Sequence, residues 1–264
     1  MTQRALYDNE LAYWEQRLGE DVPLNSVGYR GLSDAFVSWL YRVRSRRFSS
    51  MVAPLARPDM RVLDIGSGGG FYVALWKKFG VKDIVATDLT DASMRAVERR
   101  FPGVETSRFD VGAQDVPFPA ESFDAVSCMD VVHHLMDDAA YQRAFENCAR
   151  LLRSGGFLIF TDNFLHGPAY RGPHHVSRSL IHIEQVLRAA GFQIVKRAPM
   201  FVLMNNPIDS RSSLFKFYWR GMNFVLRNAA VGAVAGTLLY PLELLLTSVL
   251  KEGPSTEIVV ARKR

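Results

Sequence analysis

The sequence has little cysteine, and no secretory signal is visible in it. Its two cysteines, Cys128 and Cys148, lie in or beside apolar runs and lack a metal-binding spacing. We expect free thiols buried in the core, in a reducing compartment. Met1 is followed by a polar segment, and no secretory signal is visible. The expected location is therefore cytoplasmic, with association with a membrane left open.

Internal repeats, low-complexity tracts and nucleic-acid-binding motifs are also missing. The net charge of +5 includes a basic run at residues 42–47, RVRSRR. Such a run attracts phosphates, nucleic acid or anionic lipid, but more often it is a solvated helix face. Because no RNA- or DNA-binding motif lies beside it, nucleic acid is disfavoured as a partner.

Apolar residues are abundant, at 48% of the 264 residues, which is enough for a sizeable core. From residue 61 onward, strand-like and helix-like patterns alternate. This alternation predicts an α/β fold with a largely parallel sheet that binds ligands at the carboxyl ends of its strands. The expected strands are 61–65, 83–88, 104–110, 122–129, 156–162, 192–203 and 255–261. The expected helices between them are 70–79, 91–100, 138–152 and 179–190.

Both ends of the chain depart from this alternation. Residues 1–50 are expected to be helical around a loop at 23–31, with an aromatic, Arg-rich helix at 34–48. This N-terminal segment either packs against the core or closes over a pocket as a lid.

Near the other end, the run 229–250 is almost entirely apolar and about long enough to cross a bilayer. Pro241 and Glu243 interrupt it, and the strands on both sides would share one sheet, so spanning is disfavoured. A substrate lid, a dimer surface and a hairpin resting on a membrane remain open.

The most informative stretch is RVLDIGSGGGF, at residues 61–71. Gly66 and Gly68 follow a strand-like run and precede a helix-like one. Glycine lacks a Cβ and takes positive φ, so a cofactor can lie against the main chain beside the helix amides. Asp64 precedes the glycines, which suits a cation better than a pyrophosphate. Asp88 ends the next strand, where a carboxylate can accept ribose hydroxyls, unless it is a helix N-cap.

Together these motifs resemble those of the class I S-adenosylmethionine-dependent methyltransferases. The likeness covers roughly residues 60–200. LDIGSGGG matches the first motif, Asp88 the acid after strand two, and RFDV at 108–111 the acidic position near the adenine. FPxxxFDxV at 118–126 and LLRxGG at 151–156 match the segments before strands four and five.

The resemblance implies a Rossmann-like seven-stranded, mostly parallel sheet with helices on both faces, whose last strand is antiparallel and pairs beside strand six. It also implies S-adenosyl-L-methionine as the cofactor. By this resemblance Asp64, Gly66 and Gly68 would hold the methionine part and Asp88 the ribose. Asp110 and Val111 would meet the adenine, and residues 129–131 would face the sulfonium. The cofactor-binding residues predicted in this way are Asp64, Gly66, Ser67, Gly68, Asp88, Leu89, Asp110, Val111, Met129 and Asp130.

The general base is less clear. A hydroxyl nucleophile has to lose its proton, and histidine suits that task near neutral pH. His134 and, after it, His133 are the catalytic candidates because they follow strand four at the ligand edge. The family often has histidine here, so a structural role stays open. His166, His174 and His175 lie in a later Gly- and Pro-rich loop, either facing the pocket or exposed to solvent.

A metal site is a competing interpretation. Asp130, Asp162 and Asn163 end neighbouring strands and are similar to the oxygen ligands of the metal-dependent catechol-type methyltransferases, where Mg²⁺ could chelate a diol. However, Asp130 is displaced by about one residue from that spacing, and strand side chains alternate faces. We therefore expect no metal.

The sequence thus predicts an S-adenosylmethionine-dependent methyltransferase in three parts. Residues 1–55 form a helical lid, 56–204 and 254–264 the cofactor-binding core, and 205–253 an apolar helical insertion that caps the substrate. The expected acceptor is a hydrophobic small molecule or lipid-like compound, methylated at oxygen by in-line displacement, because an apolar lid desolvates such an acceptor.

Several alternatives stay open at this point. They are methylation at carbon or nitrogen of a natural-product intermediate, a non-catalytic module that keeps the fold, and a nicotinamide-dependent enzyme. The insertion at 205–253 could also contact a membrane peripherally or form a homodimer.

Overall fold

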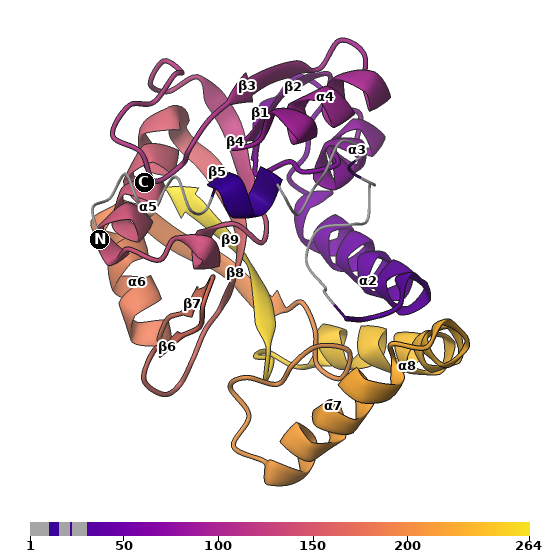
Figure 1. Cartoon of the computed structure of the whole chain (residues 1–264). Coiled ribbons are helices and arrows are strands. Elements are labelled where there is room, and N and C mark those ends of the chain that lie inside the picture. Colours follow the sequence, from indigo (N-terminus) through magenta and orange to yellow (C-terminus); the bar gives the residue numbers. More distant parts are fainter. Residues whose placement is uncertain (1–10, 16–21, 23–30) are drawn as a thin grey trace.

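The computed structural model describes residues 11–15, Val22 and residues 31–264. The strands of its main sheet are β1 (Arg61–Ile65), β2 (Asp83–Asp88), β3 (Glu105–Arg108), β4 (Phe123–Cys128), β5 (Leu152–Asn163), β8 (Phe192–Pro199) and β9 (Thr256–Lys263). Their order is β3-β2-β1-β4-β5-β9-β8 (Figure 1). The pairs from β3 to β5 are parallel, and β9 runs antiparallel to both β5 and β8. The expected seven-stranded sheet is confirmed.

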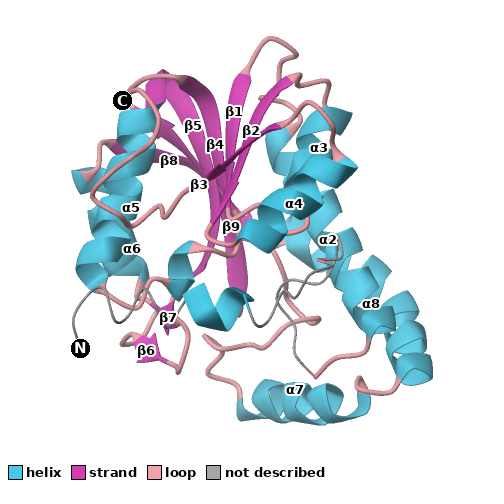
Figure 2. Ribbon diagram, turned by 45° about the horizontal axis from the view of Figure 1, so that its top comes forward, coloured by secondary structure: helices cyan, strands magenta, loops and turns pink. Residues whose placement is uncertain are grey.

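Helices cover both faces of this sheet (Figure 2). One face carries α2 (Asp34–Val52), α3 (Phe71–Lys78) and α4 (Asp91–Arg100), and the other carries α5 (Asp138–Leu151) and α6 (Leu180–Ala189). Successive side chains of a strand point to opposite faces, so Val62 joins the hydrophobic cluster around Trp76 of α3, and Leu63 joins the cluster around Phe145 of α5. Burial on both faces explains why β1, β2 and β4 are largely apolar.

Capping side chains set where the helices begin. Thr90 accepts a hydrogen bond from the Ser93 amide at the start of α4, and Asp137 accepts one from the Ala140 amide at the start of α5. Each such bond satisfies an amide that has no partner inside its own helix. The same role falls to Ser33, Ser179, Ser212 and Asn228.

The sixth expected strand is shorter than the sequence suggested, because β8 ends at Pro199 rather than at Leu203. The amides of Val202 and Leu203 donate hydrogen bonds of 2.7 Å each to the carboxylate of Glu243. A carboxylate from outside the sheet thus satisfies backbone groups that a longer strand would have paired.

The expected insertion before the last strand forms α7 (Ser213–Val225) and α8 (Ala229–Val249). β8 ends and β9 begins at the same edge of the sheet, because Pro199 pairs with Glu257. Thr256 pairs with Asn163, the last residue of β5, so this is the carboxyl edge of the parallel strands. The insertion therefore projects from the edge at which such sheets bind ligands.

The helix expected at residues 34–48 is α2, which continues to Val52. Its apolar side chains belong to the cluster on the α3 side of the sheet. Of the helical segment expected before it, the structure describes residues 11–15, which are helical. The loop expected at 23–31 lies outside the described residues apart from Gly31.

Two of the four arginines in the basic run are buried, which corrects the expectation of a solvated face. Arg44 is 4% and Arg47 is 8% exposed, whereas Arg42 and Arg46 are exposed. The two buried residues are three positions apart and so share one side of the helix. Nε of Arg47 donates a hydrogen bond of 3.0 Å to the carbonyl of Pro199, and burial lowers the pKa of this guanidinium.

Candidate active site

A pocket opens at the carboxyl edge of the sheet, beside the ends of β1, β2 and β4. It encloses about 710 Å³, part of which is open to solvent. All predicted site residues except Asp64, Ser67 and His133 line it. The lining consists of Trp14, Ile65, Gly66, Gly68, Asp88, Leu89, Phe109, Asp110, Val111, Met129, Asp130, Val131, His134 and Leu135.

The glycine turn after β1 forms one wall of the pocket. Gly66 and Gly68 have φ angles of 68° and 51°, in the left-handed region that favours glycine. A Cβ on Gly66 would overlap Cγ2 of Val131, which also lines the pocket. Glycine at this position therefore permits both the turn and the close approach of the segment after β4.

Asp88, the last residue of β2, is bound to this turn. Its Oδ2 accepts a hydrogen bond of 2.9 Å from the Gly68 amide, and its Oδ1 accepts bonds of 3.1 and 3.0 Å from the amide and hydroxyl of Thr90. Burial raises the pKa of Asp88, and these hydrogen bonds oppose that rise. Thr90 caps α4, so Asp88 is not the N-cap and its carboxylate lies in the pocket wall.

Asp64 lies beneath the pocket rather than in its lining. It is 1% exposed, and its Oδ1 accepts a hydrogen bond of 2.5 Å from Oγ of Ser127. Its Oδ2 has no hydrogen-bond partner among the described residues. Burial raises the pKa of Asp64 to about 7. A buried carboxylate short of a partner is stabilised by a nearby cation, as the motif suggested.

Ser67 supports the turn from behind. Its hydroxyl donates a hydrogen bond of 2.9 Å to the carbonyl of Asp64 and does not face the pocket. The predicted contact of Ser67 with a cofactor would therefore use backbone atoms rather than the side chain.

The wall after β2 and β3 is apolar apart from one carboxylate. Leu89, Phe109 and Val111 line it together with Asp110. Oδ1 of Asp110 accepts a hydrogen bond of 2.9 Å from the Gly112 amide, and burial raises the pKa of Asp110. An apolar slot beside a hydrogen-bond acceptor suits a heteroaromatic ring that carries an amine.

The end of β4 brings Met129 and Asp130 to the pocket. Asp130 has a φ of 60°, which is uncommon for a residue with a side chain. Its amide donates a hydrogen bond of 2.7 Å to Oγ1 of Thr161, and its carboxylate forms an ion pair with Arg44 of α2. Arg44 also donates a 3.4 Å bond to the Tyr72 hydroxyl. A buried arginine thus holds this part of the wall in place.

The two adjacent histidines of η1 (Val132–His134) lie differently. His134 lines the pocket, and its Nδ1 is 2.7 Å from the carbonyl of His174. Because a carbonyl only accepts, Nδ1 carries the hydrogen and the neutral ring presents Nε2 as its basic nitrogen. Trp14 packs edge-on against this ring, with centroids 4.9 Å apart. His133 is outside the lining, and burial holds its pKa well below the usual value.

Comparisons with known proteins agree with this geometry. A family model described as a methyltransferase domain matches residues 63–160. An uncharacterized methyltransferase of Bacillus subtilis, YcgJ, is 31% identical over 151 residues, which cover 51% of this chain and 57% of that protein. A ubiquinone biosynthesis O-methyltransferase of Paracidovorax citrulli is 34% identical over 114 residues, which cover 42% of this chain and 45% of that protein.

The chain therefore spans about half the length of the curated relatives it matches. Among solved structures, a SAM-dependent methyltransferase of Leishmania major matches with a TM-score of 0.59 at 17% identity, over 98% of this chain and 83% of that one. The matched sequence runs from β1 to β5 and contains the glycine turn, Asp88 and Asp110. Residues 63–160 therefore match a methyltransferase domain, and the chain has the fold of the class I S-adenosylmethionine-dependent methyltransferases.

The remaining histidines of the chain lie outside the pocket lining. Nδ1 of His166 is 2.6 Å from Oδ2 of Asp209, and Nε2 is 3.3 Å from Oε2 of Glu252. The bond to Asp209 raises the pKa of His166. His166 thus ties the segment after β5 to both ends of the insertion. Burial lowers the pKa of His175, while His174 contributes the carbonyl that orients the pocket histidine.

The side chains considered as metal ligands all have protein partners. Asp130 pairs with Arg44, and Oδ2 of Asp162 accepts a hydrogen bond of 2.7 Å from the Tyr141 hydroxyl. Oδ1 of Asn163 accepts a hydrogen bond of 3.0 Å from a threonine of β9. Within the described ranges, no group of three His, Cys, Asp or Glu side chains is arranged to hold a metal ion.

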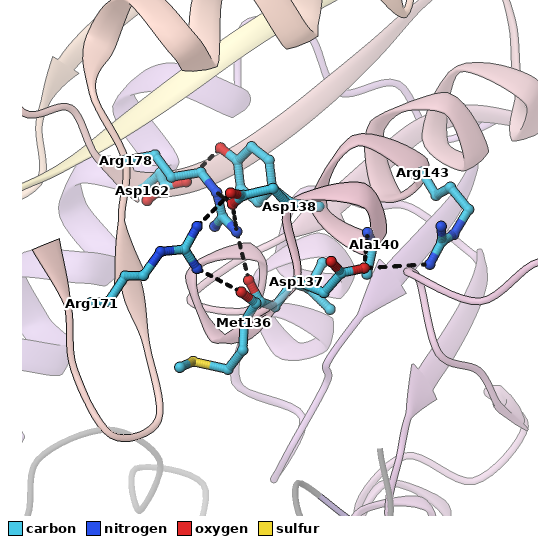
Figure 3. A network of polar contacts seen from close by, with 10 residues as sticks. Met136, Asp137, Asp138, Ala140, Arg143, Asp162, Arg171 and Arg178 are labelled. Carbon is cyan, nitrogen blue, oxygen red and sulfur yellow. Dashed lines mark hydrogen bonds and ion pairs between the residues drawn. The ribbon is translucent and has the colours of Figure 1, made fainter. Parts of the chain in front are cut away.

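A network of arginines and carboxylates braces the pocket wall between η1 and α5 (Figure 3). Nη2 of Arg178, which is buried, donates bonds of 2.8 Å to Oδ1 of Asp138 and to the carbonyl of Leu135. Arg171 pairs with the same Asp138. These arginines come from a two-stranded ribbon and its flank, where the sequence predicted a loop. The ribbon consists of β6 (Tyr170–Arg171) and β7 (Val176–Ser177).

Five residues of the site were not predicted from the sequence. They are Trp14, Arg44, Ile65, Phe109 and Leu135. Arg44 had a signal, because it continues the spacing of Phe36 and Leu40 along one helix side, so the buried stripe runs through it. Trp14 had only the aromatic stripe of its segment, which does not say where that segment lies.

Proposed function

We propose that this chain transfers a methyl group from S-adenosyl-L-methionine to an oxygen of a small hydrophobic or lipid-like acceptor. One observation carries the proposal: Asp88, the left-handed glycine turn and the slot beside Asp110 meet in a single pocket. The relative from Paracidovorax citrulli is named an O-methyltransferase, and that name favours oxygen as the atom methylated.

The residues of the pocket fit this cofactor. The unpartnered Oδ2 of Asp64 is suited to a cation, and Gly66 and Gly68 leave space against the backbone. Asp88 is an acceptor suited to ribose hydroxyls, and Asp110 one suited to the adenine amine. When bound, the cofactor supplies a methyl group on a positively charged sulfur. The chain binds and aligns the reactants, and alignment alone contributes several kcal/mol.

His134 is the proposed general base. The bond from its Nδ1–H to the His174 carbonyl orients the ring, and in this tautomer Nε2 is the basic nitrogen that would take the proton of an acceptor hydroxyl. His133 is the second candidate. Its lowered pKa keeps it neutral, but it does not line the pocket in this conformation.

The lid at 1–55 and the cap at 205–253 are proposed to select the acceptor. Trp14 of the lid lines the pocket, and Arg44 of α2 pairs with Asp130 in its wall. The cap projects from the same sheet edge. Apolar groups from both parts would displace water from a hydrophobic acceptor, which strengthens the electrostatic contacts inside the pocket.

Calorimetric titration with S-adenosylmethionine tests cofactor binding. Asp88→Asn should weaken binding about 10- to 100-fold, because hydrogen bonds to a charged group contribute roughly 1.5–3 kcal/mol. Asp88→Ala is a poorer test, because the amides of Gly68 and Thr90 would also lose their acceptor and the folded state would be destabilised. Asp91→Asn, at an exposed acid nearby, is the matched control. The proposal is overturned if the unsubstituted chain gives no heat of binding with S-adenosylmethionine, or if it binds NAD instead.

Mass spectrometry with a panel of hydroxylated aromatic compounds and lipids tests the reaction. His134→Gln should lower kcat about 10²- to 10⁴-fold and leave cofactor affinity unchanged. His182→Gln, at a histidine of α6 outside the pocket lining, is the control. An unchanged kcat in H134Q would remove the base from the mechanism, and a methyl group found on nitrogen or carbon would replace oxygen as its target.

A further inference from the structure

Helix α8 exposes a continuous apolar stripe on one side and packs with the other. Its buried side includes Gly232 and Gly236, where a Cβ would overlap Ser33 and Trp39 of the α2 region. Its exposed large apolar residues recur at spacings of three or four, which puts them on one side of the helix. They are Val231, Val234, Leu238, Leu242, Leu245 and Val249.

Helix α7 adds a second exposed apolar surface. No residue of α7 is buried, and Leu214, Phe217 and Phe224 are each more than 70% exposed. Figure 1 shows α7 and α8 together at the side of the molecule away from α5 and α6. Monomeric proteins rarely leave so many large apolar side chains together in water, which marks this surface as a binding site.

The exposed charges between residues 210 and 251 are all positive. They are Arg211, Lys216, Arg220, Arg227 and Lys251. The segment has one acid, Glu243, which is buried with its carboxylate on backbone amides. The acids at the two ends of the insertion, Asp209 and Glu252, pair with His166, and Glu252 also pairs with Arg197. Apolar stripes flanked by cations match the surface of an anionic membrane. A second copy of the chain would bring like charges together and is disfavoured.

The geometry favours resting on a membrane over crossing it. α8 is the one helix in the described part of the chain that is long and apolar enough to span, and 17% of its apolar window is buried. Yet glycines pack it along α2, and Glu243 ties it to the loop after β8. The strands before and after the insertion share one sheet, and α7, at 13 residues, is too short to return the chain across a bilayer.

We propose that the exposed faces of α7 and α8 bind the surface of an anionic lipid bilayer. The apolar stripes enter the boundary between headgroups and acyl chains, and the cations lie over the anionic headgroups. Because the insertion leaves the sheet at its carboxyl edge, docking places the edge that carries the pocket near the bilayer. Binding of this kind requires neither cofactor nor acceptor, so it is tested separately from methyl transfer.

Flotation of the full chain with vesicles tests the apolar part of the surface. The chain should float with phosphatidylglycerol–phosphatidylcholine vesicles, much less with phosphatidylcholine alone, and should be released by high salt. Leu238→Gln should lower the partition coefficient about 10- to 100-fold, since burying a leucine contributes roughly 1.5–3 kcal/mol. Ile181→Gln in α6 is the matched control, because Ile181 is 69% exposed and Leu238 71%.

A second pair of variants tests the charges. Lys216→Gln with Arg220→Gln should lower the partition coefficient on anionic vesicles about fivefold per charge. Lys77→Gln with Lys78→Gln removes two exposed cations from α3 and should have little effect.

Three outcomes would overturn the proposal. The first is equal flotation with neutral and anionic vesicles, or losses in the control variants as large as those in the α7 and α8 variants. The second is a dimer in sedimentation without lipid that Leu238→Gln dissociates. The third is a bound fraction that withstands alkaline carbonate, which would indicate a spanning helix.

Discussion

Replacing Gly66 by alanine tests how tightly the glycine turn and the segment after β4 fit together. The new side chain meets two separate costs. Alanine at a φ of 68° costs roughly 1–2 kcal/mol. Its Cβ also overlaps Cγ2 of Val131, and forcing extra volume into a packed site costs typically about 1–3 kcal/mol. Gly66→Ala should therefore lower the free energy of unfolding by about 2–5 kcal/mol.

A double-mutant cycle separates the two costs. Val131→Ala removes Cγ2, and the Cβ of residue 131 is then at an ordinary contact distance of 3.5 Å from the new methyl group. In that background Gly66→Ala should cost only the backbone strain, so the coupling between the two substitutions should be about 1–3 kcal/mol. Urea denaturation of the four proteins measures it.

Gly103→Ala is the control for strain alone. Gly103 has a φ of 87°, and a Cβ there would meet no described atom within 4 Å. Gly103→Ala should lower the free energy of unfolding by the same amount with or without Val131→Ala. Additive free energies at residues 66 and 131 would refute the reasoning, because they would show that no clash is relieved.

Three further predictions concern buried charge. Arg44→Ala leaves the carboxylate of Asp130 unpaired and should cost about 2 kcal/mol in urea denaturation, less than a fully buried pair because Asp130 is partly exposed. Tyr141→Phe removes the hydroxyl that donates to Asp162 and should cost roughly 1–3 kcal/mol, and a titration that left the pKa of Asp162 unchanged would contradict it. Burial raises the pKa of Asp64 to about 7, so the native state holds this proton to a higher pH than the unfolded chain does. The free energy of unfolding should therefore decrease as the pH rises from about 4 to about 7. Asp64→Asn should reduce the slope of that decrease by up to about 1.4 kcal/mol per pH unit. An unchanged pH profile would show that Asp64 does not titrate in this range.

The sequence predicted those parts of the fold that local contacts decide. α4 occupies residues 91–100 as expected, because its cap, Thr90, is adjacent to it. β8 ends early because of Glu243, which is more than forty residues away in the chain, and no local pattern reports that contact. Arg44 and Arg47 belong to a basic run whose composition is typical of a solvated helix face. Both are buried because α2 packs on the sheet.

The candidate site likewise has parts that the sequence predicts and parts that depend on contacts between distant residues. Strand ends and the glycine turn meet at one edge of any parallel sheet, so Asp88, Asp110 and Met129 could be placed together from their positions after strands. Asp64 lies under the pocket because side chains alternate along β1, whose buried neighbour on β4 is Ser127. The orientation of His134 depends on a carbonyl forty residues later, which the sequence does not connect to it.

The central place of β9 has a consequence for how the chain folds during synthesis. Residues 256–263 lie between β5 and β8, yet the ribosome makes them after everything else in the sheet. Until they emerge, the edge of β5 is unpaired, β8 has no neighbour and the apolar insertion is already in water. Unpaired strand edges and exposed apolar surface promote aggregation. The nascent chain should therefore need a chaperone, or an early contact with lipid, for as long as its sheet is incomplete.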